Sequence, residues 1–189
     1  MIKIKSSEIF FETKDALIHD AYIGFKEDYL CIHSLFRKHK PDTVLEIGTN
    51  VGNGVNVIAR AIPTAKIYSL DLDYDTMRLI SKQYPIDVNG EDGVGSAVTV
   101  PYIQLRGDSL RFDYNSLMPI DAWYIDGEHD YIHVLHESTQ AFLSRAKLIV
   151  WHDSDITDVY RGIVDASTDY DSYELYRVFD TRIAYAVKK

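Results

Sequence analysis

The sequence predicts an α/β protein with five parallel strands followed by a terminal antiparallel hairpin, seven strands in all. Short apolar runs alternate with amphipathic segments along most of the chain, which is the pattern of strands joined by crossover helices. The last two strand-like runs, residues 173–179 and 183–187, are separated by only three residues. A connection this short allows an antiparallel hairpin and excludes a parallel crossover. No repeat or linker divides the chain, so we expect one domain over residues 1–189.

The expected elements follow in a regular order. The first helix places Tyr29, Ile32 and Phe36 at helical spacing, and Pro41 ends it. The strands are compact apolar runs that suit a buried parallel sheet. We expect residues 1–40 to form an N-terminal helical cap and residues 41–189 to form the core. The predicted helices cover residues 26–39, 55–61, 74–84, 130–145 and 156–167, and the predicted parallel strands cover residues 43–47, 66–70, 98–105, 121–125 and 147–151.

The composition narrows the classes of function. The chain has 189 residues and a net charge of −9, so it lacks the basic excess of proteins that grip a phosphate backbone, and we expect no nucleic-acid partner. No apolar run reaches the ~20 residues that span a bilayer, and residues 1–5 lack an apolar export core, so no membrane partner is expected. The lone Cys31 cannot form an internal disulfide, which fits a reducing, cytoplasmic location.

A glycine-rich turn follows the first predicted strand. Gly48, Gly52 and Gly54 form a Gly-x-x-x-Gly-x-Gly turn that opens the next helix. Glycines there let the backbone turn tightly and approach a nucleotide-like ligand, whereas the alternative is a tight turn without a ligand. A second glycine-containing stretch, residues 87–97, follows a helix and precedes a strand. We therefore expect it to be a mobile surface loop at the opposite edge of the sheet, far from the site.

Acidic residues mark the ends of the first three strands. Glu46 lies inside the first strand, where it can accept a hydrogen bond from a cationic ligand head or from backbone amides of the turn. Asp71 ends the second strand, where an acid can bind both hydroxyls of a ribose; an exposed turn acid is the alternative. Asp108 and Ser109 follow the third strand, where Asp108 can accept from an adenine amino group or cap the next helical turn.

Two further acids end the fourth and fifth strands at the same edge of the sheet. Asp126 and Asp153 are expected on neighbouring strands. Two carboxylates in this arrangement suit a hard divalent cation such as Mg²⁺, with water or substrate oxygens completing its shell. Both acids could also cap the helices that follow them, and the two roles are compatible.

Four of the seven histidines fall into three groups. His129, three residues after Asp126, is expected at the ligand edge, where a base with a pKa near neutral is useful. His133 and His136 continue a stripe that has the spacing of zinc ligands, but helical geometry turns this stripe away from the apolar face. We therefore expect the stripe to face solvent and to bind no zinc. His152 is flanked by apolar residues, which favours a structural role.

Taken together, these motifs resemble those of class I S-adenosylmethionine-dependent methyltransferases, which have a Rossmann-like doubly wound sheet. The resemblance covers residues 22–187 and rests on the order of the Glu46-x-Gly48 turn and the acids that end the second, third and fourth strands. More narrowly, the chain resembles the small catechol-type and sugar O-methyltransferases, in which a Val-Gly-like pair precedes the first strand; Ile23-Gly24 has that place here. In that group the metal ligands correspond to Asp126, Asp153 and a third position that is Ser154 here.

The resemblance implies transfer of a methyl group from S-adenosylmethionine to a hydroxyl of a small molecule, with Mg²⁺ as a further cofactor. His129 stands where catechol-type relatives have a lysine and would act as the base, beside Asp126 and Asp153 at the catalytic centre. An NAD-dependent oxidoreductase and an inactive methyltransferase-like binding module are the alternatives. The oligomeric state stays open, with a homodimer as one alternative. The implied cofactor-binding residues are Ile23, Gly24, Glu46, Gly48, Asn50, Gly52, Gly54, Asp71, Asp108, Ser109 and Asp126.

Overall fold

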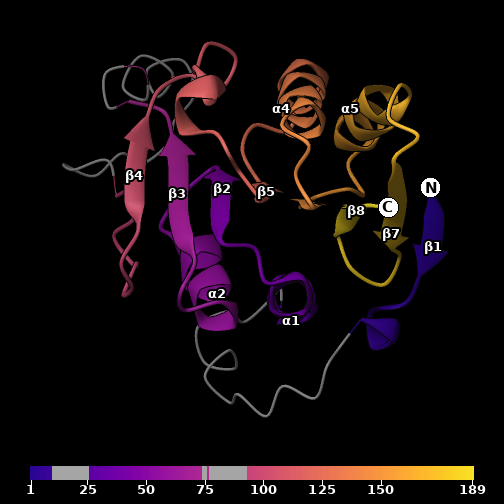
Figure 1. Cartoon of the computed structure of the whole chain (residues 1–189), viewed down its shortest axis with the longest axis horizontal. Helices are drawn as coiled ribbons and strands as arrows, with labels where there is room; N and C mark the ends of the chain where they lie inside the picture. The colour runs from indigo at the N-terminus through magenta and orange to yellow at the C-terminus, as the bar shows by residue number, and fades with distance from the viewer. Residues whose placement is uncertain (10–25, 74–75, 77–92) are drawn as a thin grey trace.

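The protein folds around one eight-stranded sheet. The structure is a computed structural model and describes residues 1–9, 26–73, 76 and 93–189. The strand order is β1-β7-β8-β6-β5-β2-β3-β4, with β4 at one edge and β1 at the other (Figure 1). The strands are β1 (Ile2–Ile4), β2 (Thr43–Ile47), β3 (Lys66–Asp71), β4 (Ile103–Arg106), β5 (Ala122–Ile125), β6 (Leu148–Trp151), β7 (Tyr173–Val178) and β8 (Ala184–Lys188).

The central part of the sheet is the predicted parallel one. Strands β6, β5, β2, β3 and β4 are neighbours in that order, and each pairs in parallel with the next. The chain moves outward from β2 through β3 to β4 and then returns to β5 on the other side of β2. The order therefore reverses between β2 and β5, and ligands of open α/β sheets bind at such a switch point.

The terminal hairpin is also confirmed. Strand β8 pairs antiparallel with both β7 and β6, so β8 is the reversed strand of the sheet. The predicted count of seven strands is one short, because β1 pairs in parallel with β7 and places Ile4 beside Val178. The Ser6 amide and hydroxyl each donate to the Asp180 carboxylate at 2.8 Å, which holds the N-terminal segment against the hairpin. The region expected as a helical cap therefore also contributes an edge strand.

Four α-helices cover the sheet in the described part of the chain: α1 (Lys26–His39), α2 (Asn53–Ala61), α4 (Tyr131–Leu143) and α5 (Thr157–Ser167). Short 3-10 helices cover Ser6–Glu8 and Tyr114–Leu117. The positions of the four α-helices agree with the prediction. The helix predicted over residues 74–84 lies almost entirely outside the described residues. None of the described helices is long and apolar enough to cross a membrane.

Successive strand residues point to opposite faces of the sheet, and the sheet separates two apolar cores. On β5, Tyr124 joins the core formed with α1 and α2, whereas Trp123 and Ile125 join the core formed with α4 and α5. Cys31 is fully buried on α1 as a free thiol. With helices packed on both faces, the strand ends stay open to ligands.

The predicted position of the second glycine-containing stretch is wrong. The described part of the second glycine-containing stretch, residues 93–97, lies at the ligand edge rather than the opposite one. The Gly95 amide donates to the Asn50 carbonyl at 2.7 Å, and the Ala97 amide donates to the Val51 carbonyl at 2.9 Å. The cause is the late start of β4 at Ile103: the residues before it span at most ~3.5 Å each, enough for the chain to run back along the sheet to the glycine-rich turn.

Candidate functional site

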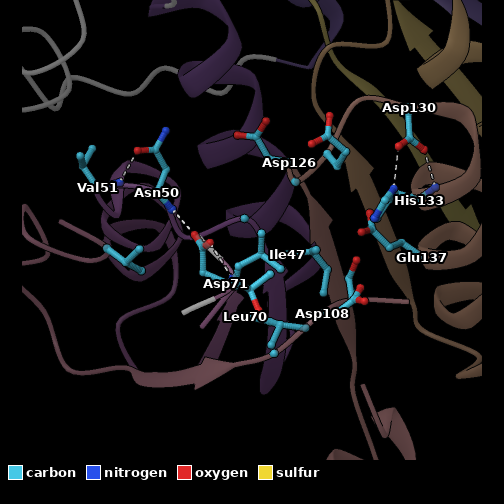
Figure 2. A pocket seen from close by; sticks show the side chains of 18 of the residues that line it. Ile47, Asn50, Val51, Leu70, Asp71, Asp108, Asp126, Asp130, His133 and Glu137 are labelled. Atoms are coloured by element: carbon cyan, nitrogen blue, oxygen red, sulfur yellow. Dashed lines mark hydrogen bonds and ion pairs between the residues drawn. The ribbon is translucent and has the colours of Figure 1, made fainter. Parts of the chain in front are cut away.

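A cavity of about 630 Å³ opens at the carboxyl ends of β2, β3, β4 and β5. It is lined by the turns that follow these strands, by the start of α4, and by Thr76, Gly93 and Val94. Figure 2 shows Asn50 and Val51 at one end of this cavity and His133 and Glu137 at the other. The topology of the sheet thus brings the predicted strand-end acids to one ligand cavity.

The glycine-rich turn contributes one cavity residue and two packing residues among its glycines. Gly48 lines the cavity at a φ of +93°, and a Cβ there would overlap the Asp126 carbonyl oxygen. Only glycine allows the β2 and β5 turns to approach this closely. Gly52 faces the Val98 side chain and Gly54 faces the Glu46 carboxylate, and neither lines the cavity. Both glycines allow close packing at the turn, and their expected role in cofactor contact stays a prediction.

Glu46 supports the turn from beneath instead of reaching a ligand. Only 1% of the residue is exposed, and its carboxylate accepts a hydrogen bond from the Ser69 hydroxyl. The Ser69 hydroxyl also lies 2.7 Å from that of Thr49, which connects Glu46 to the turn. Burial raises the pKa of Glu46 well above its usual value. The expected contact of Glu46 with a cationic ligand head stays a prediction.

Asp71 lies in the cavity at the end of β3. One carboxylate oxygen accepts the Asn50 amide at 2.8 Å, and the other accepts the Leu72 amide at 2.8 Å. Asn50 has a φ of +46° and also lines the cavity (Figure 2). Each carboxylate oxygen can accept a second hydrogen bond, so Asp71 is fixed in place and still able to bind a ligand hydroxyl.

Asp108 caps the turn after β4 and lines the cavity as well. Its side chain accepts the Leu110 amide at 2.9 Å, and Arg111 Nε lies 3.6 Å from its second oxygen. Ser109 lines the cavity beside it, and the Ser109 carbonyl accepts the Tyr114 hydroxyl at 2.8 Å. The capping alternative is therefore observed, at a position where Asp108 also faces the cavity.

Glu137 is a cavity residue that sequence reasoning missed. It lies on α4, is 0% exposed and lines the cavity. Within the described residues, neither carboxylate oxygen has a partner with hydrogen-bond geometry. Burial raises its pKa to about 7, and the Ser109 hydroxyl opposes this shift. The available signal was its helical position, three residues after Val134 and four before Ala141, which is the buried face of α4.

A second group of charged residues adjoins the cavity and shares Asp126 with it. This ionic cluster consists of Asp28, Asp126, His152, Asp153 and Arg182. The Nδ1 atom of His152 lies 3.2 Å from Asp126 and 3.0 Å from Asp153, and its Nε2 atom lies 3.3 Å from Asp28. Arg182 donates to Asp28 at 2.9 Å and also to Asp153. The cluster therefore joins α1, the ends of β5 and β6, and the β7–β8 hairpin.

The ionic cluster shifts the pKa values of its members. Burial acts to lower the pKa of His152, but hydrogen bonds with Asp126, Asp153 and Asp28 raise it to about 11. Burial acts to raise the pKa of Asp153, but His129 and His152 hold it well below its usual range. His152 is thus a central charged group, and the expected structural role understates it.

The other histidines differ from the prediction in part. His129 Nε2 lies 3.0 Å from Asp153, with 44% of the His129 side chain exposed, and the hydrogen bond to Asp153 raises the His129 pKa. His129 is next to the ionic cluster but does not line the cavity. His133 lines the cavity with Nδ1 2.8 Å from Asp130, and the His136 ring packs 6.3 Å from that of Tyr114. The prediction that His133 and His136 face solvent is therefore wrong, because α4 turns these two histidines toward the cavity and Tyr114.

The ionic cluster also offers ligand atoms to a divalent cation. One atom each from Asp126, His152 and Asp153 lie within 4.8 Å of one another. Two carboxylate oxygens and an imidazole nitrogen suit Mn²⁺ or Fe²⁺ at least as well as Mg²⁺. His152 must lose a proton to bind, so protons compete with the metal. The donor set fits a divalent cation with His152 as the third ligand, next to the fully buried Ser154. Ile23 and Gly24, the remaining expected cofactor residues, lie outside the described residues.

Comparisons with known proteins connect this site to one fold. No protein-family model and no curated protein matches the sequence. Among solved structures, an O-methyltransferase from Bacillus cereus in complex with S-adenosylhomocysteine (SAH) has a TM-score of 0.59 at 14% identity, covering 95% of this chain and 93% of that one. A protein from Staphylococcus aureus described as a caffeoyl-CoA O-methyltransferase has a TM-score of 0.58 at 15% identity, covering 92% and 88%.

An SAH-bound methyltransferase from Podospora anserina is similar to the same extent. Its TM-score is 0.56 at 16% identity, covering 97% of this chain and 92% of that one. At these identities the likeness establishes the fold and leaves the chemistry to the site. The chain has the Rossmann-like α/β fold that these methyltransferases share.

Proposed function

We propose that this protein is an S-adenosylmethionine-dependent methyltransferase that acts on a hydroxyl oxygen of a small molecule. The observation that carries the proposal is the cavity at the topological switch point, where Gly48, Asp71 and Asp108 lie in succession along three neighbouring strand ends. The SAH complexes among the solved structures with this fold support the same cofactor.

Each group in the cavity has a defined part in binding. Gly48 and Asn50 hold the methionine end of the cofactor, because their backbone forms the narrow turn above Glu46. Asp71 accepts hydrogen bonds from the ribose hydroxyls through the lone pairs that its two amide donors leave open. Asp108 and Ser109 contact the base. S-adenosylmethionine, when bound, supplies a methyl group on a sulfonium.

The acceptor lies next to Asp126 and the ionic cluster. His129 takes the proton of the acceptor hydroxyl, and Asp153 orients the His129 ring through the 3.0 Å contact. The cavity and the ionic cluster together would hold the acceptor oxygen in line with the methyl group and the sulfur. This alignment lowers the barrier to methyl transfer. A divalent cation held by Asp126, His152 and Asp153 would lower the pKa of the acceptor hydroxyl.

Calorimetric titration tests the cofactor assignment. We expect the protein to bind SAH and not NAD, and Asp71→Ala to weaken SAH binding by ~1–3 kcal/mol because the ribose loses a charged acceptor. Asp158→Ala is the matched control, because Asp158 lies on α5 outside the cavity with 50% of its side chain exposed. Preferential binding of NAD would overturn the proposed function, and unchanged affinity in a folded Asp71→Ala protein would overturn the ribose assignment.

Turnover then tests the reaction. A panel of phenols, sugars and nucleosides supplied with S-adenosylmethionine should yield a methyl ether from at least one class of hydroxyl. Tight SAH binding without turnover of any acceptor in the panel would favour a binding module instead.

A further inference from the structure

The buried carboxylate of Glu137 has no part in the proposed function so far. The residue is 0% exposed and lines the cavity. Within the described part of the chain neither carboxylate oxygen has a partner with hydrogen-bond geometry, although the nearby Ser109 hydroxyl acts to lower its pKa. A buried polar group without a partner is destabilising, and more so if it is charged. An apolar side chain at this position of α4 would avoid that cost. The presence of an acid here therefore indicates that a ligand supplies its missing hydrogen bonds.

The place of Glu137 in the cavity restricts which part of a ligand it meets. Figure 2 shows Asn50 and Asp71 toward one end, Asp108 beyond them, and Glu137 toward the other end. If Asp71 holds the ribose, the base extends from there toward Asp108 and Ser109. The Glu137 carboxylate lies on that side, with one oxygen 3.7 Å from the point that a Cβ on Gly127 would occupy. The Glu137 carboxylate therefore lies against the β5 turn at Gly127.

The chemistry of the side chain fits the amino-substituted edge of a purine. A neutral carboxylic acid offers one donor and one acceptor side by side, whereas a carboxylate offers acceptors only. Adenine presents an exocyclic amine, which donates, next to a ring nitrogen, which accepts. The burial that raises the pKa of Glu137 to about 7 favours the neutral acid in this position.

We propose that Glu137 recognises the adenine base of the cofactor by pairing with its 6-amino group and the adjacent ring nitrogen, an assignment that rests on the proposed function. In the neutral side-chain acid of Glu137, the C=O oxygen accepts a hydrogen bond from the amine and the O–H group donates one to the ring nitrogen. Asp108 and Ser109 then hold the base from the β4 side, and Glu137 holds it from α4.

The test compares two ligands on several variants. The ligands are SAH and its analogue in which hydrogen replaces the 6-amino group, and the readout is the ratio of their dissociation constants. We expect the wild-type protein to prefer SAH by roughly 10–100-fold, because the analogue leaves the Glu137 carbonyl oxygen without a donor. Glu137→Gln keeps one donor and one acceptor and should retain most of this preference. Glu137→Met keeps the volume without either group and should lower the ratio well below that of the wild-type protein, with any remaining preference due to Asp108.

The ratio separates recognition from stability, because both ligands are measured on the same folded protein. Glu174→Met, a change at an exposed position on β7 outside the cavity, is the control and should keep the wild-type ratio. An unchanged ratio in Glu137→Met would overturn the inference while leaving the proposed function intact. Loss of the preference in Glu137→Gln as well would overturn the neutral donor–acceptor pairing. Failure of the wild-type protein to bind SAH at all would instead overturn the proposed function.

Discussion

The ligand cavity and the ionic cluster are two acidic regions that share Asp126 and treat their acids in opposite ways. In the ionic cluster, Asp28 and Asp153 each contact the Arg182 guanidinium and the His152 ring. In the cavity, Asp71 accepts two backbone amides, and Glu137 has no hydrogen-bond partner in the described part of the chain. The cluster thus closes its charges internally and joins elements, whereas the cavity leaves acceptors open.

This contrast separates residues that hold the fold together from residues that are open to a ligand at the same sheet edge. Buried charges that are paired with good geometry are destabilising to break, because the remaining partner is left without compensation. Open acceptors cost stability and are retained where a ligand completes them. Four changes to single groups test whether the two regions differ in this way.

The largest effect is expected at His129, between the two regions. His129→Ala should lower kcat by ~10²–10⁴-fold with SAH affinity unchanged, because the acceptor hydroxyl loses its general base. Steady-state kinetics with an accepted hydroxyl substrate measure the effect. His136→Ala is the control, since His136 contacts Tyr114 and lies away from the ionic cluster. Equal effects of the two substitutions would show that His129 is not the base.

Breaking the ionic cluster should cost stability. Arg182→Met removes a cation from buried Asp28 and Asp153, and we expect the free energy of unfolding in urea to fall by about 3 kcal/mol. Lys147→Met is the matched control, because Lys147 forms an exposed ion pair with Asp121 at 2.9 Å. Such surface pairs contribute about 0–1 kcal/mol. Similar losses in both variants would contradict the distinction between the cluster and the surface.

Glu137, the open acid of the cavity, should lower the free energy of unfolding above neutral pH. The folded-state pKa of Glu137, about 7, exceeds the ordinary value of 4.5, so the folded state holds this proton more tightly than the unfolded state does. Its contribution to stability is present below pH 4.5 and is lost as the pH rises through 7. Relative to Glu137→Gln, the wild-type protein should therefore lose up to about 3 kcal/mol between pH 4.5 and 8. Urea unfolding of both proteins across this range measures the difference, and a constant difference would contradict the burial of an ionisable acid.

The smallest effect is expected from metal removal. We expect Mg²⁺ or Mn²⁺ to bind at Asp126 and Asp153 only in roughly the millimolar range, because Arg182 and the His152 proton already balance the cluster. Chelation with EDTA should then lower activity by about tenfold or less, and Asp126→Asn should remove the dependence on added metal. Full activity in EDTA would leave the two acids to roles other than metal binding.

The sequence by itself determined the sheet and the edge at which the site lies. Apolar runs such as Thr43–Ile47 and Leu148–Trp151 are buried strands because a parallel sheet is covered on both faces. The bounds of α1 followed from helical spacing and the proline after it. Gly48 and the acids Asp71, Asp108 and Asp126 were placed at one edge because the carboxyl ends of parallel strands meet there.

Only the tertiary structure decided which side chains meet across distant segments. Asp28 and Arg182 are 154 positions apart, and no local pattern indicates their contact. The run of residues 93–97 back to the glycine-rich turn depends on where β4 begins, and the pairing of β1 depends on the distant β7. The helical spacing places Glu137 on the apolar face of α4, but only the packing of α4 shows that its carboxylate lines the cavity. Local periodicity indicates where a strand lies or which face of a helix is apolar. Burial, strand pairing and pKa values depend on contacts between distant segments, which form only in the folded chain.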